Sequence, residues 1–446
     1  MKKCIILVLS LGLLLTLLAG CEYFVPDGIL EEAEKNRPSF LPQGTNPPGA
    51  EDLPANVAGG VDEYGFTVFP AGNYLADRKF DTDEFLPDYD ADPAFINFHS
   101  TSGYALCRTE DTIYSLRPGS SQINLIMYAD KATGISGPLC GKPECLHRDS
   151  KCNAYVANRA DGLCVYDGKL YWVNGGTNIT RMNPDGTGRE TVASVGSVYD
   201  NINNDMSVVF HRGYLYVAGS QHQVIENGVA MGSFTINAMP LDGSEGFTIL
   251  RKLVDGTGPE CLIKPVGNDL YIMLYYFDYD DEVEHKGAYD VVEFYRWDSK
   301  TRQAEFISST QSVPHGLQFE KRNFHPVPGD GIYFQAYEYL DGKLNHVIYK
   351  YSVETDTYEK GAWLYGYDYL FYCQDFIITD AGVADTNRIV YTFNYDGNLL
   401  FSSDPVEEHG VNTFLGADSE YAYYNCIPDG DYVAVPLNGG DVIAIG

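Results

Sequence analysis

A short unit of two strands and their turns recurs along this chain, and its clearest copy occupies residues 167–190. In that copy, Asp167-Gly168 predicts a tight turn, the aromatic run 170–173 predicts a strand, and Gly175-Gly176 predicts a reversal of the chain. Residues 179–182 then alternate apolar with polar side chains, which is typical of a second strand. A chain made of such units is constrained to antiparallel sheets joined by short turns.

Looser copies of the unit, each an aromatic strand after a polar turn, occur at 110–114, 212–216, 267–271, 329–333 and 418–423, with a weaker copy near 379–390. Seven units give a period of about forty to fifty residues, as expected for four-stranded propeller blades. We therefore predict an all-β fold, a β-propeller of about seven blades over residues 59–446, with six or eight blades remaining possible. A β-solenoid is disfavoured because its repeats are shorter and more regular.

Composition supports this fold class and limits the partners. The chain has 35 tyrosines and 22 phenylalanines, residues that favour strands. Its formal net charge of −32 argues against binding to nucleic acid or to anionic lipid through the protein surface.

The first twenty residues read as an export signal. Lys2 and Lys3 precede an apolar run, 4–18, that is short for a transmembrane span. The run ends in Leu-Ala-Gly-Cys at 18–21, which resembles the bacterial lipobox. That resemblance implies cleavage before Cys21 and attachment of a diacylglycerol, with acyl chains such as palmitate, to its sulfur. An ordinary secretory signal or an uncleaved anchor is the alternative.

Residues 21–58 are rich in proline and poor in large apolar residues, so we expect a flexible tether behind the lipidated cysteine. The expected location is the extracytoplasmic face of the cell membrane, with the lipid as the membrane partner. No later stretch is apolar enough to cross a bilayer.

A cysteine-rich insert at 139–155 holds the most specific cluster of chemically active residues, which are Cys140, Cys145, His147 and Cys152. Three thiols and one imidazole are a donor set that Zn²⁺ accepts at structural sites. The spacing matches no zinc-finger pattern, and an exported protein can instead join Cys140 or Cys145 to Cys152 in a disulfide. We favour a disulfide or bare thiols and retain structural zinc as the alternative; Cys164 lies twelve residues further on.

Other candidate groups are less specific. We expect Cys107, Cys261, Cys373 and Cys426 to be buried thiols. The acidic runs 88–92 and 278–282 have the alternate spacing of calcium ligands, and a solvated loop is the competing interpretation. Four histidines could meet at one face of a propeller, although a surface or hydrogen-bonded histidine is the favoured interpretation of each: His222, His285, His315 and His325. Aromatic segments 275–277, 365–369 and 421–424 could bind a partner or could be packing residues.

Two resemblances bear on the fold. Tyr171-Trp172-Val173-Asn174 and the Asp-Gly turn that follows it resemble one blade of the YWTD-type propellers. Over nearly its full length the chain more closely resembles Gram-positive envelope lipoproteins that carry a propeller of unknown function, many with a similar cysteine-rich insert. The resemblance implies location and fold and assigns no activity.

The sequence contains no Gly-x-Ser-x-Gly, His-Glu-x-x-His or phosphate-binding loop signature. We therefore expect a binding or scaffolding module at the cell envelope, with a protein or a glycan as its partner, rather than an enzyme. The alternative is a polysaccharide hydrolase or lyase with its site at the mouth of the propeller channel, where residues from different blades would meet.

Overall fold

The computed structural model describes residues 97–99, 106–118, 124–133, 135–156, 160–174, 178–194, 206–226, 229–254, 257–281, 286–311, 317–327, 329–340, 343–364, 369–373, 375–383, 387–403, 411–426 and 432–444. All of them belong to one compact unit, Pro54–Gly446. The predicted signal (1–20) and tether (21–58) lie outside the described residues. Within the described ranges there are strands and turns, and no helix long and apolar enough to cross a bilayer.

The strands form seven antiparallel sheets, numbered here as blades in chain order. Blade one contains β2 (Leu106–Arg108), β3 (Thr112–Pro118), β4 (Asn124–Asp130), β5 (Ser136–Pro138) and β6 (Tyr155–Val156). Blade two contains β7 (Ala160–Tyr166), β8 (Lys169–Asn174), β9 (Asn178–Met182) and β10 (Glu190–Ser194). Blade three contains β11 (Met206–His211), β12 (Tyr214–Glu226), β13 (Val229–Pro240) and β14 (Phe247–Val254), with β1 (Asn97–His99) beside β11.

Blade four contains β15 (Thr257–Val266), β16 (Asp269–Asp281), β17 (Lys286–Asp298) and β18 (Gln303–Gln311). Blade five contains β19 (Leu317–Val327), β20 (Gly331–Leu340), β21 (Lys343–Ser352) and β22 (Thr357–Leu364). Blade six contains β23 (Tyr369–Tyr372), β24 (Ile377–Val383), β25 (Asn387–Phe393) and β26 (Leu399–Ser402). Blade seven contains β27 (Val411–Ala417), β28 (Tyr421–Cys426), β29 (Tyr432–Pro436) and β30 (Ile443–Ala444).

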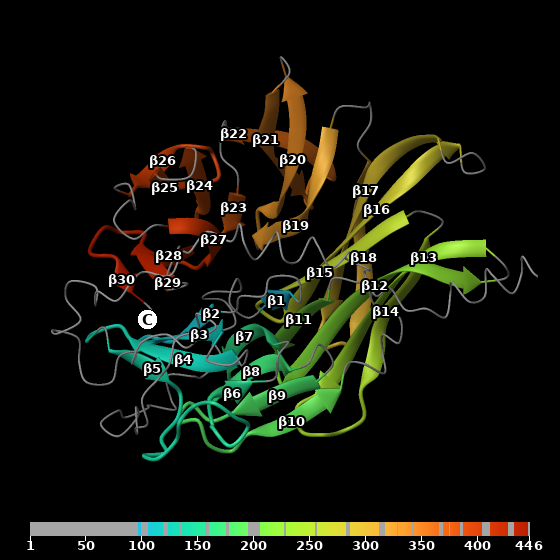
Figure 1. Ribbon diagram of the computed structural model, residues 1–446. Helices are drawn as coiled ribbons and strands as arrows, with labels where there is room; N and C mark the ends of the chain where they lie inside the picture. Colours follow the sequence, from blue (N-terminus) through green and yellow to red (C-terminus); the bar gives the residue numbers. More distant parts are fainter. Residues whose placement is uncertain are drawn as a thin grey trace, which may run out of the picture. The chain divides into compact units, whose positions relative to one another are not determined.

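Each blade is a meander of four strands, and the blades follow one another in sequence order around a ring (Figure 1). This confirms the predicted all-β propeller and sets the number of blades at seven. Blades one and three each gain a fifth short strand, β6 and β1, which the repeat pattern did not predict.

The recurring apolar–tyrosine pair lies in the second strand of the blades, whose two faces are both covered by neighbouring blades. Leu170 and Tyr171 are 0% and 1% exposed, and Leu215 and Tyr216 have the same values. Adjacent strand residues point to opposite faces, so a strand buried on both sides needs large apolar residues at consecutive positions. The apolar–tyrosine pair therefore recurs in the sequence because the second strand of each blade packs against both neighbouring blades.

Tight turns join the first two strands of each blade. Asp167 and Gly168 have φ angles of 45° and 69°, and Arg212 and Gly213 have 51° and 79°. Two consecutive positive φ angles are those of a type I′ hairpin turn, which matches the twist of the flanking strands. The predicted turn at Asp167-Gly168 is confirmed.

Three neighbouring blades have unusually long second and third strands. β12, β16 and β17 have 13 residues, β13 has 12, and β20 and β21 have 10, whereas those of the other four blades have five to seven. In a meander, the turns between the second and third strands lie at one end of every blade, which we call the hairpin end. The hairpins of blades three, four and five extend from the ring at that end (Figure 1).

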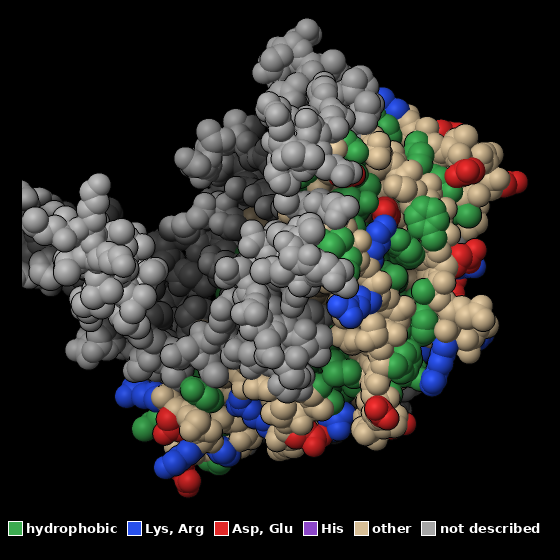
Figure 2. Space-filling view, turned by 90° about the vertical axis from the view of Figure 1, so that its right-hand side faces the viewer, with side chains coloured by type: hydrophobic (Ala, Val, Ile, Leu, Met, Phe, Trp, Pro, Cys, Tyr) green, Lys and Arg blue, Asp and Glu red, His purple; other side chains and the backbone are tan. Residues whose placement is uncertain are grey.

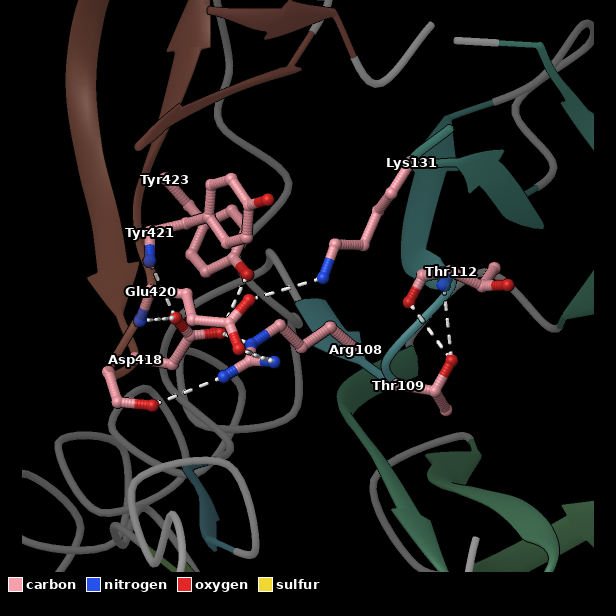
Figure 3. A network of polar contacts seen from close by, with 9 residues as sticks. Arg108, Thr109, Thr112, Lys131, Asp418, Glu420, Tyr421 and Tyr423 are labelled. Atoms are coloured by element: carbon pink, nitrogen blue, oxygen red, sulfur yellow. Dashed lines mark hydrogen bonds and ion pairs between the residues drawn. The ribbon is translucent and has the colours of Figure 1, made fainter. Parts of the chain in front are cut away.

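Blade seven is formed by β27–β30 alone, with no strand from the N-terminal side of the chain. The contact between blade seven and blade one is therefore made by side chains rather than by a shared sheet. Arg108 and Lys131 of blade one face Asp418 and Glu420 of blade seven (Figure 3). Tyr432 of blade seven adds a hydrogen bond of 3.0 Å to the carbonyl of Leu116.

Candidate metal centre

The outer strand of blade one is interrupted by a loop. β4 pairs first with β5, through Met127 and Pro138, and then with β6, through Leu125 and Tyr155. Between these two pairings, Ile126 accepts a hydrogen bond from Leu139 N (2.8 Å) and donates one to Ala154 O (2.9 Å). Residues 140–153, the cysteine loop, therefore leave the sheet and return to it at the same residue of β4.

The cysteine loop brings its four candidate ligands together. The Sγ atoms of Cys140, Cys145 and Cys152 and a ring nitrogen of His147 all lie within 4.8 Å of one another. His147 Nδ1 is 3.3 Å from Cys152 Sγ. Cys140, His147 and Cys152 are 0%, 1% and 2% exposed, and Cys145 is half-buried.

Short turns in the loop direct these side chains inward. Cys145 N donates to Lys142 O at 3.2 Å, and Cys152 N donates to Asp149 O at 3.0 Å. His147 adopts a φ of 55°, which costs a non-glycine residue free energy, and its N–H points at Cys145 Sγ at 3.4 Å. An N–H directed at sulfur stabilises negative charge on that sulfur.

Electrostatics within the loop favour at least one thiolate. Hydrogen bonding from the Cys152 thiol lowers the pKa of Cys140 to about 3, against the effect of burial and with further help from His147 and two backbone N–H groups. The same hydrogen bond and burial raise the pKa of Cys152, and burial raises the pKa of Cys145. A thiolate on Cys140 in this buried place would be stabilised by a cation bound beside it.

The loop packs on blade two. Gly186 lies in a turn of that blade with φ 74°, and a Cβ built there would be 2.5 Å from the carbonyl oxygen of Leu139. Arg189 donates to the carbonyl of Tyr155, and its guanidinium lies 5.2 Å from the centre of the Trp172 ring. The position of the cysteine loop is therefore coupled to the interface between blades one and two.

Three sulfurs and one imidazole nitrogen at these separations form a group that could bind a metal ion. The three cysteines, for which the sequence left a disulfide and a metal site as alternatives, are all free thiols here. Cys164 is no part of the group: it is fully buried in the core between blades two and three, where burial raises its pKa.

The remaining cysteines behave as predicted where the structure describes their side chains. Cys107, Cys261 and Cys373 are buried, with side chains 1–3% exposed. The side chain of Cys426 lies outside the described part.

Of the four histidines that could have met at one face, the two that the structure describes, His222 and His325, lie toward opposite ends of their blades. His325 lies near the end of β19 that leads into the turn to β20, so it is remote from the hairpin end, and its ring stacks on those of Tyr372 and Tyr395. His222 lies in the half of β12 that runs into the hairpin of blade three. His285 and His315 lie outside the described residues.

The acidic run at 278–282 lies mainly within β16 rather than in a calcium loop. Asp278 accepts hydrogen bonds from Tyr279 N (2.8 Å) and from the hydroxyl of Tyr289 (3.1 Å). The run at 88–92 lies outside the described residues.

Two of the three aromatic segments pack in the core, at least in part. Tyr275 and Tyr276 are 1% and 9% exposed, and Tyr423 and Tyr424 are 1% and 0% exposed. For the segment 365–369, the structure describes no side chains.

Sequence reasoning missed three buried carboxylates that join blades, which are Asp290, Glu293 and Asp418. Asp290 accepts from Phe319 N of blade five at 2.6 Å, and Glu293 pairs with Lys252 of blade three. No local pattern marks them, because their partners lie on other blades.

No protein-family model and no curated protein sequence matches the chain. Solved structures do resemble it in fold. An ulvan lyase bound to -[GlcA(1-4)Rha3S]- is 11% identical, with 79% of this chain and 97% of that chain covered and a TM-score of 0.50. An oligogalacturonate lyase from Vibrio parahaemolyticus is 10% identical over 87% and 95% of the two chains, with a TM-score of 0.43. A second oligogalacturonate lyase, in complex with manganese, is 12% identical over 87% and 94%, with a TM-score of 0.42. At these identities the likeness concerns the fold alone.

Proposed function

We propose that this protein is an extracytoplasmic binding module, held at the cell membrane by a lipid on Cys21, whose ligand docks at the hairpin end of blades three to five. The proposed location at the membrane is supported by the signal-like segment 1–20 and the proline-rich segment 21–58. The docking surface is supported by the three long neighbouring hairpins. The length of those hairpins is the observation that carries the proposal.

The hairpin of blade four carries groups suited to contact with a ligand. Tyr279 and Tyr289 are half-buried on opposite faces of the hairpin, and Asp278, the register partner of Tyr289, accepts hydrogen bonds from the Tyr289 hydroxyl and from the backbone N of Tyr279. Blade five adds Tyr337 and Glu338 at half-buried positions. Tyrosine rings offer flat apolar faces with a polar edge, and fixed carboxylates accept hydrogen bonds from hydroxyl or amino groups.

Charge narrows the class of ligand. The chain has 62 acidic residues against 30 lysines and arginines, which disfavours a polyanion. On the side of the molecule seen in Figure 2, where blades three and four lie, acidic and basic side chains of described residues are interspersed, with hydrophobic groups between them. We propose a neutral or amino-bearing envelope glycan as the ligand.

The test is binding of the purified full-length chain to a glycan array, with Tyr279→Ala and Tyr289→Ala as variants. Each variant should weaken binding by about 5- to 150-fold, since loss of an aromatic contact at a binding site costs about 1–3 kcal/mol. Phe306→Ala is the matched control, because Phe306 is an exposed aromatic (54%) on the outer strand of blade four. If no glycan on the array binds and the chain captures a protein from envelope extracts, the ligand is a protein and not a glycan.

The second candidate is a polysaccharide lyase or hydrolase with its site at the channel mouth. Lyases of this fold among the similar structures motivate it. A polyuronate substrate requires cationic groups near the site; in blade four, Lys264 is buried with its ammonium 6.0 Å from the centre of the Phe324 ring. Release of unsaturated sugar from a polyuronate by the purified chain would decide for the enzyme and against the binding module.

Within either role, we propose that a metal at the cysteine loop is structural. Four protein ligands fill a tetrahedral site and leave no position for a substrate or a water molecule.

A further inference from the structure

We propose that the cysteine loop binds one Zn²⁺ through Cys140, Cys145, His147 and Cys152, and that the ion holds together the two halves of the interrupted outer strand of blade one. This inference goes beyond the proposed binding function and does not depend on it.

The first step of the argument concerns geometry. In a tetrahedral zinc site with Zn–S near 2.3 Å and Zn–N near 2.0 Å, ligand atoms are separated by about 3.5–3.8 Å. The four ligand atoms here lie within 4.8 Å of one another, and His147 Nδ1 is 3.3 Å from Cys152 Sγ. A shift of about 1 Å in one or two side chains completes the coordination shell.

The second step concerns the alternative disulfide. A disulfide uses two of the three cysteines and leaves a thiol and the imidazole buried beside it. His147 is almost completely buried at a φ of 55°, with Nδ1 3.3 Å from Cys152 Sγ, a position that a metal ligand requires and a disulfide does not. A metal uses all four groups.

The third step concerns the identity of the metal. Three thiols and an imidazole are soft and borderline donors, which select zinc and not manganese, magnesium or calcium. Each thiol that binds gives up its proton to solvent, and the neutral imidazole binds through its unprotonated nitrogen. The resulting centre has a net charge of −1.

The fourth step concerns what the ion does. Leu139 and Ala154 are held to Ile126 by one backbone hydrogen bond each, and β6 has only two residues. A two-residue strand has little stability of its own. Cys140 and Cys152 are the ligands nearest to the two ends of the loop, so a shared ion fixes β6 against β4 and the loop against Gly186 of blade two. Without the ion, the blade keeps β2–β5, and the loop with β6 is free to detach.

The experiment measures metal content and coordination in the purified, reduced full-length chain. We expect one zinc per chain, and after exchange with Co²⁺ the intense charge-transfer and d–d absorption bands of a tetrahedral site with three thiolates. Cys145→Ser and His147→Ala should weaken binding at least about 100-fold in competition with a chelator. Cys261→Ser, which removes a buried thiol elsewhere, should leave affinity and spectrum unchanged.

Two further measurements keep the inference testable if a variant fails to fold. Chelation of wild-type zinc should increase hydrogen exchange in 139–156 without unfolding blades three to seven. A disulfide between any two of the loop cysteines in protein isolated from its natural envelope would overturn the inference. So would octahedral rather than tetrahedral Co²⁺ bands, or a zinc content unaffected by both ligand variants.

Discussion

Arg108, at the end of the first strand of blade one, places its guanidinium Nε against the buried carboxylate of Asp418, at the start of the first turn of blade seven (Figure 3). Asp418 also accepts hydrogen bonds from Glu420 N and Tyr421 N, both 2.7 Å, and from the hydroxyl of Tyr423, 2.8 Å. Burial works against the charge of Arg108, yet Asp418, Tyr423 and Glu420 together raise its pKa above the ordinary value. The pair is therefore ionised and lies where the first blade meets the last.

Arg108→Met should lower the free energy of unfolding by about 3 kcal/mol, because it leaves the Asp418 carboxylate buried without its cation. The midpoint of urea unfolding measures the loss. Arg296→Met is the matched control, since Arg296 is 44% exposed and pairs with Glu305 at the surface. Its expected effect is below about 1 kcal/mol. Equal losses in the two variants would show that the contact between Arg108 and Asp418 has no special part in closing the ring.

The sequence could predict what is encoded locally. The turn at Asp167-Gly168 and the pair Leu170-Tyr171 mark a hairpin and a strand covered on both faces, and their repetition marks the ring. The contact between Arg108 and Asp418 could not be predicted, because the two residues are 310 positions apart in the sequence and no spacing rule connects blades.

The cysteine loop is an intermediate case. Its four candidate ligands stand within thirteen residues, so the sequence could name them. It could not show that the ends of the loop meet at Ile126 or that Gly186 of another blade lies against it. Both facts depend on how β4 is paired and how blades one and two pack.

Gly186→Ala should destabilise the protein by about 3 kcal/mol or more, because alanine is strained at a φ of 74° and its Cβ would overlap the carbonyl oxygen of Leu139. Thermal unfolding of the purified variant measures the effect. Gly243→Ala is the control at the corresponding Asp-Gly turn of blade three, where φ is 82° and no atom lies within 4 Å of the added Cβ. Only the backbone cost of about 1–2 kcal/mol applies there.

If the overlap with Leu139 displaces the cysteine loop, Gly186→Ala should also weaken metal binding, whereas Gly243→Ala should not. Two variants of equal stability and equal metal affinity would contradict the close packing of the Gly186 turn on the loop.

Glu293 of blade four is the acceptor for a cation and two phenols. Lys252 of blade three donates to its Oε1 at 2.6 Å, and the hydroxyls of Tyr276 and Tyr295 lie at 3.0 and 2.9 Å from its two oxygens. Glu293→Gln keeps the shape and removes the charge, which should cost about 2 kcal/mol because Lys252 remains partly buried without a counterion.

A second measurement on Glu293→Gln separates charge from packing. Burial first, and then the charge of Glu293, raise the pKa values of Tyr276 and Tyr295. Tyrosinate absorbance during alkaline titration should therefore show two phenols ionising at lower pH in the variant than in the wild type, though still above an exposed tyrosine. An unchanged titration would mean that the carboxylate does not act on these rings.

The last prediction concerns stability at alkaline pH. Burial raises the pKa of Tyr216 from 10.0 to about 12. The unfolded chain therefore loses this proton at lower pH than the folded chain does. The contribution to stability is complete below pH 10 and is lost as the pH rises from about 10 to 12. Two pKa units correspond to about 2–3 kcal/mol. Burial also raises the pKa values of Tyr349 and Tyr358 to about 12, with the same sign of effect.

Urea midpoints measured between about pH 9 and pH 11.5 should accordingly fall in the wild type. In Tyr216→Phe the midpoint should decrease less over the same pH range, because the contribution of the Tyr216 phenol is absent. The variant should nevertheless start from a lower midpoint at about pH 9. Tyr216 is 1% exposed and fixed in the core between blades, so the ring cannot reach water to ionise without local opening of the fold. If both proteins show the same dependence on pH, Tyr216 ionises in the folded state as readily as in the unfolded chain, and the tight packing of the second strand of blade three would be refuted.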